Sequence, residues 1–477
     1  QIRRATFDLT GLPPSPQAAD DFAAAFQQDP DRAFVALVDR LLDSPAYGER
    51  WARHWLDVAG YADSDGYAEQ DLPREHAYRY RDYVIRALND DMPYDQFVRE
   101  QLAGDELAAE LRIDANADSP DQRAEFERLV TATGFLRMAP DGTGAQNDLA
   151  ARHASVAATM QIVSSALYGM TIGCAQCHDH RYDAISQADY YRLRAVFDPG
   201  FDVANWRVPA ARLVSLQTKE EQQQAAAIEA EAKKLDDARL AKQEEFITEV
   251  LGKELAKADE ASRDVLRKAY RTAAAERTAE QVELLKQHPR INQLSAGSLY
   301  LYDSTYQTKH AETLKAMADE AAAVRAKKPP TRCVRAFCEV ARQGESVPAS
   351  FVFHRGDPAS PKEEVGPGDL SVLASYRDVA IPHDTPDLPT TGRRLALARL
   401  LTDGSHPLLA RVLVNRVWMH HFGAGIVPSV ADFGVLGDRP THPELLDWLA
   451  AEFVESGWSL KRLHRQMKTS EAWRQAG

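Results

Sequence analysis

Residues 174–178 read Cys-Ala-Gln-Cys-His and give the strongest chemical signal in this 477-residue sequence. In the C-x-x-C-H spacing, two thiols form thioethers with the vinyl groups of one haem, and the adjacent histidine supplies an axial imidazole. We therefore expect Cys174 and Cys177 to hold a c-type haem and His178 to be its metal ligand. A reducible disulfide and half of a zinc site use the same spacing, so both alternatives stay open.

The groups that complete such a centre come from elsewhere in the sequence. His180 follows at once and is a candidate for the cofactor site, where it would bond a propionate or orient His178. The fold brings in the sixth iron ligand, for which the candidates are His54, His153, Met160 and His180. A bound Met or His would make an electron carrier, whereas an open position would allow substrate chemistry.

A second polar cluster is predicted on the helix that begins at Ser44-Pro45. His54 and Asp57 lie one helical turn apart, so the carboxylate can orient the imidazole, and Asp63 follows soon after. These three are candidate catalytic residues on one wall of a pocket. In the alternative interpretation, the tryptophans of this helix only pack in the core, and His54 and Asp57 form an ordinary surface pair. Asp63 and Asp65 also suggest a calcium site. That signal is weak, because the other positions of an EF-hand loop do not fit.

Two further catalytic candidates lie in the carboxy-terminal part of the chain. Arg355 follows a predicted strand, and His420 shares a helix face with Arg416. Neighbouring helical residues point about 100° apart, so His420 and His421 are not expected to share a metal. Cys333 and Cys338 would need a turn between them to form a disulfide, and two free thiols are the equal alternative.

The composition excludes some classes of partner. The chain has 71 acidic and 57 basic residues and a formal charge of -14, which argues against coating DNA or RNA. Its apolar runs are too short to cross a bilayer. We therefore expect no nucleic acid and no membrane span.

The pattern of start and stop signals predicts a mainly α, multi-helical protein of two modules. The amino-terminal helical module covers residues 1–214 and holds the cysteine motif in a loop between helices, with Ser186 and Asp189 starting the next helix. Residues 215–290, rich in Ala, Glu, Lys and Gln, predict an inserted charged helical hairpin, either a solvated spacer or a docking arm. The carboxy-terminal module, 291–477, is expected to begin with a small β-sheet over 332–355 and to continue as helices, one of them from a capping box at Thr441 to Glu444.

Several long motifs resemble one known family. They are RATFDLTGLPP (4–14), SPAYGERWARHWLDVAGYAD (44–63), MPYDQFVREQLAG (92–104), CAQCHDHRYDAISQADYY (174–191), residues 354–357, residues 414–422 and residues 439–449. In this order they resemble the planctomycete-type cytochrome-associated proteins, which contain the domains of unknown function 1549 and 1553. Residues 155–159, Ser-Val-Ala-Ala-Thr, depart from the family's Arg-Val-Asp-Thr-Thr-like run.

The resemblance implies export to the periplasm, a redox partner such as an upstream cytochrome domain, and a genomic association with polysaccharide utilisation. It supplies no established reaction. Together with the C-x-x-C-H motif, it predicts a haem-dependent oxidoreductase acting on an organic substrate, with a carbohydrate as one option, bound between the two modules. A non-catalytic electron-transfer or carbohydrate-binding module is the alternative, and a zinc or other metal site in the cysteine loop is the second.

Overall fold

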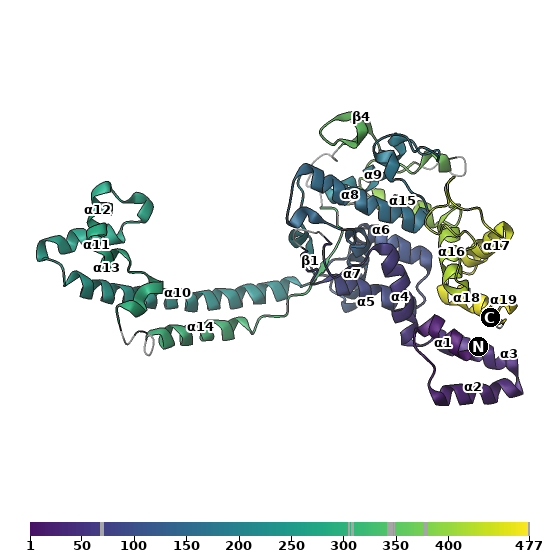
Figure 1. Ribbon diagram of the computed structural model, residues 1–477, viewed down its shortest axis with the longest axis horizontal. Coiled ribbons are helices and arrows are strands. Elements are labelled where there is room, and N and C mark those ends of the chain that lie inside the picture. The colour runs from purple at the N-terminus through teal and green to yellow at the C-terminus, as the bar shows by residue number, and fades with distance from the viewer. Residues whose placement is uncertain are drawn as a thin grey trace. The chain divides into compact units, whose positions relative to one another are not determined.

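The computed structural model describes residues 1–66, 71–303, 306, 310–340, 347, 349–374 and 380–475. It confirms a mainly α protein with a little β-structure (Figure 1). The chain forms two compact units: residues 1–216 with 332–477 make unit 1, and residues 217–331 make unit 2. None of the described helices combines the length and the hydropathy that crossing a membrane requires.

Unit 1 combines both predicted modules around one apolar core. The amino-terminal half contributes α1 (Ile2–Thr10), α2 (Pro16–Gln28), α3 (Pro30–Leu42), α4 (Pro45–Ala59), α5 (Ala77–Asn89), α6 (Tyr94–Leu111), α7 (Pro120–Ala132), α8 (Leu149–Val163) and α9 (Gln187–Phe201). The carboxy-terminal half contributes α15 (Arg393–Thr402), α16 (Leu409–Phe422), α17 (Pro443–Glu455), α18 (Leu460–Thr469) and α19 (Glu471–Arg474). The two ends of the chain lie close together, and Gln1 Nε2 donates to the carbonyl of Arg474 at 3.2 Å.

The predicted helix starts are mostly confirmed. Ser44 caps α4 with Pro45 at its first position, and Ser186 with Asp189 forms the reciprocal capping box of α9. The capping box expected at Thr441 is wrong, because α17 begins at Pro443 and is preceded by His442. The Thr441 hydroxyl instead donates to the carbonyl of Ile426 and holds a loop.

The single small sheet expected over 332–355 is two separate two-stranded antiparallel sheets. β1 (Leu213–Ser215) pairs with β2 (Cys333–Arg335), and β3 (Ser350–Phe353) pairs with β4 (Pro361–Val365). β1 and β2 lie immediately before and after unit 2, so their pairing joins the two ends of the insertion. The sequence pattern detects strand-prone residues but not their partners, which explains the difference.

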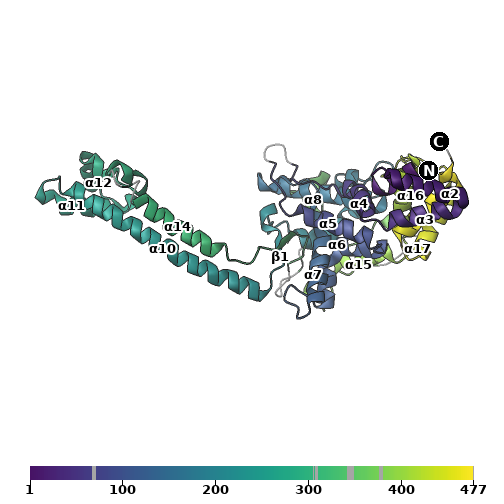
Figure 2. The same ribbon diagram turned by 90° about the horizontal axis from the view of Figure 1, so that it is seen from below.

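Unit 2 is the predicted charged helical insertion, and it is longer than expected. α10 (Lys219–Leu255) and α14 (Ala311–Arg325) run side by side in both views (Figures 1 and 2). Beyond them, α11 (Arg263–Arg271), α12 (Ala279–Gln287) and α13 (Pro289–Asn292) pack around a separate apolar cluster that includes Leu251 and Leu266. The insertion therefore ends at residue 331 rather than 290, because the helix that pairs with α10 comes after the predicted boundary.

A buried charge network joins the two halves of unit 1. The Arg394 side chain, which is fully buried on α15, donates to both carboxylate oxygens of Asp105 on α6 at 2.7 Å. It also lies 3.2 Å from Glu106 and donates to the carbonyl of Leu102, next to the point where α6 kinks at Ala103. Burial raises the pKa of Glu106, and the positive charge of Arg394 opposes that rise. The network thus needs Arg394 to balance its carboxylates.

We expect Arg394→Met to lower the free energy of unfolding of unit 1 by about 3–5 kcal/mol, because it leaves buried carboxylates without their cation. Urea unfolding followed by circular dichroism measures this change. Arg399→Met is the matched control, since Arg399 lies on the same helix and pairs with Glu110 at the surface, and we expect it to cost no more than about 1 kcal/mol. Equal losses in the two variants would contradict a special role for the buried network.

Candidate functional site

Helix α4 presents Trp51, His54 and Trp55 on one face. Ser44 and Pro45 fix where the helix begins, so residues three and four apart along it are neighbours. Trp51 and Trp55 are buried, whereas His54 is half-buried. The Nε1 of Trp55 donates to Oε1 of Gln101 at 2.9 Å, which fixes the orientation of this indole.

Helices α16 and α18 supply the opposing side chains. Arg416 and His420 lie one turn apart on α16, and His464 lies on α18. Asn415 exchanges two hydrogen bonds with the backbone of Val427, at 2.9 and 2.8 Å, so α16 is held against the loop that follows it. Arg416 donates to the carbonyls of Ser165 and Ala166, which ties α16 to the end of α8.

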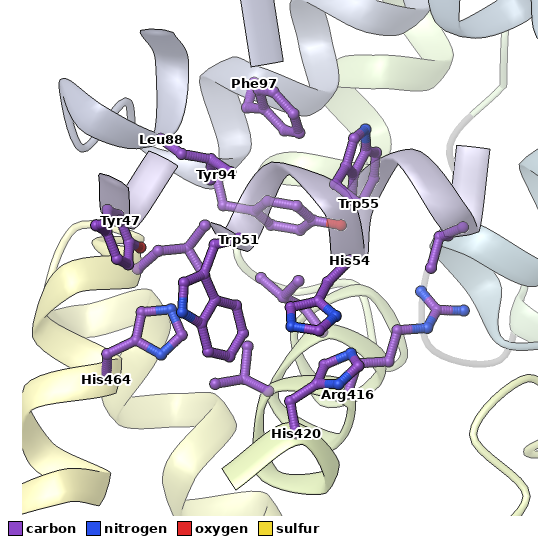
Figure 3. A pocket seen from close by; sticks show the side chains of 14 residues that line it. Tyr47, Trp51, His54, Trp55, Leu88, Tyr94, Phe97, Arg416, His420 and His464 are labelled. Carbon is purple, nitrogen blue, oxygen red and sulfur yellow. The ribbon is translucent and has the colours of Figure 1, made fainter. Parts of the chain in front are cut away.

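These helices enclose a pocket between the amino-terminal and carboxy-terminal halves of unit 1 (Figure 3). It contains about 490 Å³ of space not filled by atoms, part of which is open to solvent. The lining side chains are Tyr47, Trp51, His54, Trp55, Val58, Leu88, Tyr94, Phe97, Leu413, Arg416, Val417, His420, Leu460 and His464. The pocket brings together His54 and His420, which the sequence predicts separately as catalytic candidates.

The two half-buried imidazoles stack on each other. The ring centroids of His54 and His420 lie 3.6 Å apart with planes 27° from parallel. Burial, together with the neighbouring His420 and Arg50, lowers the pKa of His54 to about 3. Burial also lowers the pKa of His420. Both rings are therefore uncharged near neutral pH, when an imidazole offers one N–H donor and one acceptor nitrogen.

Trp51 lies at the centre of a cluster of imidazoles. Its ring centroid is 4.0 Å from that of His464 and 5.0 Å from those of His54 and His421. His421 Nε2 and His464 Nδ1 lie 2.8 Å apart and share one hydrogen bond. No local pattern in the sequence groups His464 with the other histidines, because it lies on a separate helix.

Three polar atoms of this pocket are buried without a hydrogen-bond partner: Nε1 of Trp51, the hydroxyl of Tyr47 and Nε2 of His464. Figure 3 shows the three side chains on the same side of the pocket. Buried polar groups are normally paired, so such a group calls for an explanation. Their concentration in one pocket leaves hydrogen-bonding capacity there that no described group of the protein uses.

The C-x-x-C-H motif lies in the predicted loop between helices. Residues 173–176 form a short 3-10 turn, and the amide of Cys177 donates to the carbonyl of Cys174 at 3.2 Å. Both thiols are free and exposed, so they are accessible for thioether formation. His178 is exposed, and its Nδ1 lies 2.7 Å from the carbonyl oxygen of Asp179. This contact makes Nδ1 the protonated nitrogen and leaves Nε2 with a free lone pair, as an axial ligand would need.

The loop is held by the following helix and by β3. The amide of Gln187 donates to Asp179 Oδ1 at 2.7 Å, and its side chain donates to the carbonyls of Gln176 and Phe353. Gly356 lies directly against Cys177, since a Cβ at this glycine would be 2.7 Å from the sulfur. This glycine also has a φ of +75°, which disfavours any other residue.

His180 and Asp183 connect the motif to the carboxy-terminal half. His180 Nδ1 accepts from the amide of Asp183 at 3.0 Å, and both side chains are buried. Asp183 Oδ1 accepts from the amide of Val435 at 2.6 Å, and Gly434 lies so close that a Cβ there would clash with the carboxylate. His180 is thus a structural link at the edge of the motif.

Comparison with known families finds a matching region in each half of unit 1. Residues 1–200 match the model described as PSCyt2, a protein of unknown function (DUF1549), and residues 393–477 match PSD1, a protein of unknown function (DUF1553). The chain contains a PSCyt2 domain and a PSD1 domain. No curated protein and no solved structure matches it.

The pocket lies where the PSCyt2 domain meets the PSD1 domain. The other predicted catalytic residues, Asp57, Asp63 and Arg355, are not among its lining residues. Asp57 is exposed on α4, and its negative charge opposes the lowering of the His420 pKa. Asp63 accepts a hydrogen bond from the hydroxyl of Tyr61 at 2.7 Å. Arg355 is exposed between β3 and β4 with a φ of +52°. It lies near the cysteine motif because the next residue, Gly356, packs against Cys177.

The weak calcium prediction is not supported by the geometry. Asp65 is buried and accepts from Arg74 at 2.8 Å and from Arg335 at 2.6 Å, so its charge is already balanced. In the part of the chain that the structure describes, no group of three or more His, Cys, Asp and Glu residues is arranged to hold a metal ion.

The candidates for the sixth iron ligand lie in different environments. Met160 is fully buried in the apolar core, and His54 belongs to the pocket. His153 is buried, with its ring 5.1 Å from that of Phe353, and burial lowers its pKa to about 4. His180 is engaged with Asp183.

Cys333 and Cys338 are free thiols rather than a disulfide. Cys333 Sγ lies 3.0 Å from Nε2 of His76. Burial raises the pKa of Cys338 to about 12. Cys333 lies on β2 and Cys338 lies after it, so the two thiols have different surroundings.

We expect Asp183→Ala to lower the free energy of unfolding of unit 1 by about 1–3 kcal/mol, because the buried amide of Val435 loses its acceptor. Hydrogen exchange should rise in residues 432–436, and mass spectrometry measures it. Asp357→Ala is the control, since Asp357 is exposed and bonds only nearby groups, Ala359 and Ser360. Unchanged exchange at 432–436 would show that Asp183 does not hold this loop.

Proposed function

We propose that this protein is an exported c-type haem protein that acts as a redox enzyme on an organic substrate. The observation that supports it is the accessible C-x-x-C-H loop, in which both thiols are exposed and the tautomer of His178 is set by the carbonyl of Asp179. Cys174 and Cys177 would form the thioethers, and Nε2 of His178 would be the axial ligand. When bound, the haem supplies one-electron transfer.

The residues around the loop fit such a group. Gly356 leaves room beside the sulfur of Cys177, where any side chain would collide. Tyr182, Val435 and Leu436 are exposed apolar side chains, with 49, 71 and 65% of their surface accessible. The hydrogen bond from the amide of Val435 to Asp183 holds the loop of Val435 and Leu436 against the loop that contains Tyr182. Apolar surface therefore lies near the motif. A porphyrin face that packs against apolar surface of this kind is shielded from water.

The zinc alternative has less support. A structural zinc ion takes four ligands, commonly Cys and His, in a tetrahedron. The described residues contain no group of three or more such side chains arranged around one point, and His180 is already bonded to Asp183. The thiols and His178 therefore lack the partners that a closed zinc site requires.

The substrate would bind in the pocket between the PSCyt2 and PSD1 domains. His54 and His420 are half-buried there and uncharged, so each would donate one hydrogen bond and accept another. We propose His54 and His420 as the residues that contact the substrate, while Asp63 and Arg355 would act outside the pocket.

A non-catalytic electron carrier is the second candidate. The exposed apolar residues Tyr182, Val435 and Leu436 favour it, because a surface of this kind beside a haem suits a transient contact with a redox partner. An upstream cytochrome domain, which the family resemblance implies, would be such a partner.

Production of the full chain in a bacterium that matures c-type cytochromes in its periplasm tests the proposal. We expect a c-type absorption spectrum and an intact mass that includes one haem, and we expect Cys174→Ser with Cys177→Ser to lose both. Cys333→Ser is the matched control and should keep the haem, because that thiol is buried beside His76. Wild-type protein with the mass of the bare polypeptide would refute haem attachment.

Carbon monoxide then separates the enzyme from the electron carrier. Binding to the reduced protein requires an open sixth position, as expected for catalysis. A reduced spectrum that does not change with carbon monoxide would favour the carrier. Gly356→Ala should reduce the haem content, because its Cβ would meet Cys177.

A further inference from the structure

The unpaired polar atoms of the pocket indicate the kind of molecule that binds there. The Tyr47 hydroxyl, Nε1 of Trp51 and Nε2 of His464 are all buried without partners, and Tyr47 and His464 have no exposed surface. A buried polar group that stays unpaired has lost its hydrogen bonds to water without replacement, which is unfavourable. A ligand atom that can accept or donate hydrogen bonds at this end of the pocket would remove that cost.

The rest of the pocket is apolar and largely aromatic. Trp55, Tyr94 and Phe97 form one wall, and Leu413, Val417 and Leu460 contribute aliphatic surface from the other side. Figure 3 shows the aromatic rings around the central space. Planar rings bind well between such side chains, which offer both faces and edges for packing. The body of the ligand is therefore expected to be flat and apolar.

The charges of the pocket restrict the ligand further. No Asp or Glu is among the described lining residues, and burial keeps His54 and His420 uncharged near neutral pH. Arg416 uses two of its nitrogens on the backbone carbonyls of Ser165 and Ala166. The site thus has no group to balance a cation.

A sugar fits these walls poorly. Its hydroxyl groups point in all directions, and each one placed against Phe97, Leu413 or Leu460 would lose its hydrogen bonds to water without replacement. The unpaired groups of the protein lie together at one end instead of surrounding the space. This distribution matches a ring with oxygen at one edge.

We propose that the pocket between the PSCyt2 and PSD1 domains binds a small aromatic molecule without positive charge that carries a ring oxygen substituent, a phenol or a quinone. The oxygen lies at the end formed by Tyr47, Trp51 and His464, and the ring lies between the aromatic walls. The half-buried pair His54 and His420 lies at the more exposed side, where the molecule enters. The proposal deepens the proposed function, on which its role as the enzyme's substrate rests, but binding itself does not require the haem.

Calorimetric titration of the full chain tests this binding. The protein is the Cys174→Ser, Cys177→Ser variant, which cannot attach haem, so failure of the haem proposal does not affect the result. The probes are phenol, duroquinone (a fully substituted quinone that does not add thiols) and methyl glucoside. We expect phenol or duroquinone to bind, and methyl glucoside not to bind.

Tyr47→Phe is the decisive variant, because it removes one hydroxyl that has no partner in the free protein. The variant should be at least as stable as its parent, since a buried unpaired group is lost. Its affinity for the probe that binds should fall about fivefold, the equivalent of one hydrogen bond. Tyr190→Phe is the matched control: the Tyr190 hydroxyl is also buried and unpaired but does not line the pocket, so affinity should not change.

Three results would overturn the proposal. The first is binding of methyl glucoside with no binding of either aromatic probe. The second is aromatic binding that Tyr47→Phe does not weaken, because the ligand would then lie elsewhere. The third is no binding of any probe, which would mean that the unpaired atoms of the pocket are hydrated by water alone.

Discussion

The buried guanidinium of Arg394 is the interaction on which the arrangement of unit 1 depends. It comes from the PSD1 domain and binds Asp105 and Glu106 of the PSCyt2 domain, so each domain contributes one sign of charge. A shift of either domain that separated these charges while they stayed buried would leave uncompensated charge in a low-dielectric interior, which is strongly destabilising. A buried ion pair also has a strong directional preference, because its two hydrogen bonds to Asp105 fix the relative position of α6 and α15.

That fixed position explains how a pocket can exist between two domains. Its walls come from α4 and α6 on one side and from α16 and α18 on the other, and neither set alone encloses the space. Stacked imidazoles 3.6 Å apart require their helices to stay in place to within a fraction of this distance. The charge network and the Arg416 bonds to the end of α8 provide this rigidity, and a preorganised site binds its ligand at lower entropic cost.

Local signals in the sequence predicted the elements but not their assembly. Ser44-Pro45 and Ser186 with Asp189 mark helix starts through short-range hydrogen bonds, so these starts were predictable. The loop position of Cys174 followed from the same signals. By contrast, the pairing of β1 with β2 and the grouping of His464 with Trp51 depend on contacts between residues far apart in the chain. His54 and His420 were each predicted as site residues from local patterns, and only the fold showed that they touch.

The segment after α8 links the pocket to the cysteine motif. Residues 164–168 form a π-helical turn, in which the carbonyls of Ser165 and Ala166 accept from Arg416 of the pocket. Gly169 then packs so closely against Val412 that no side chain would fit, and its carbonyl accepts from the amide of Phe433. Cys174 follows five residues later. Isolated π-turns occur frequently at functional sites. Hydrogen bonds thus join Arg416 of the pocket to the backbone that leads to Cys174, which gives the two sites a physical connection.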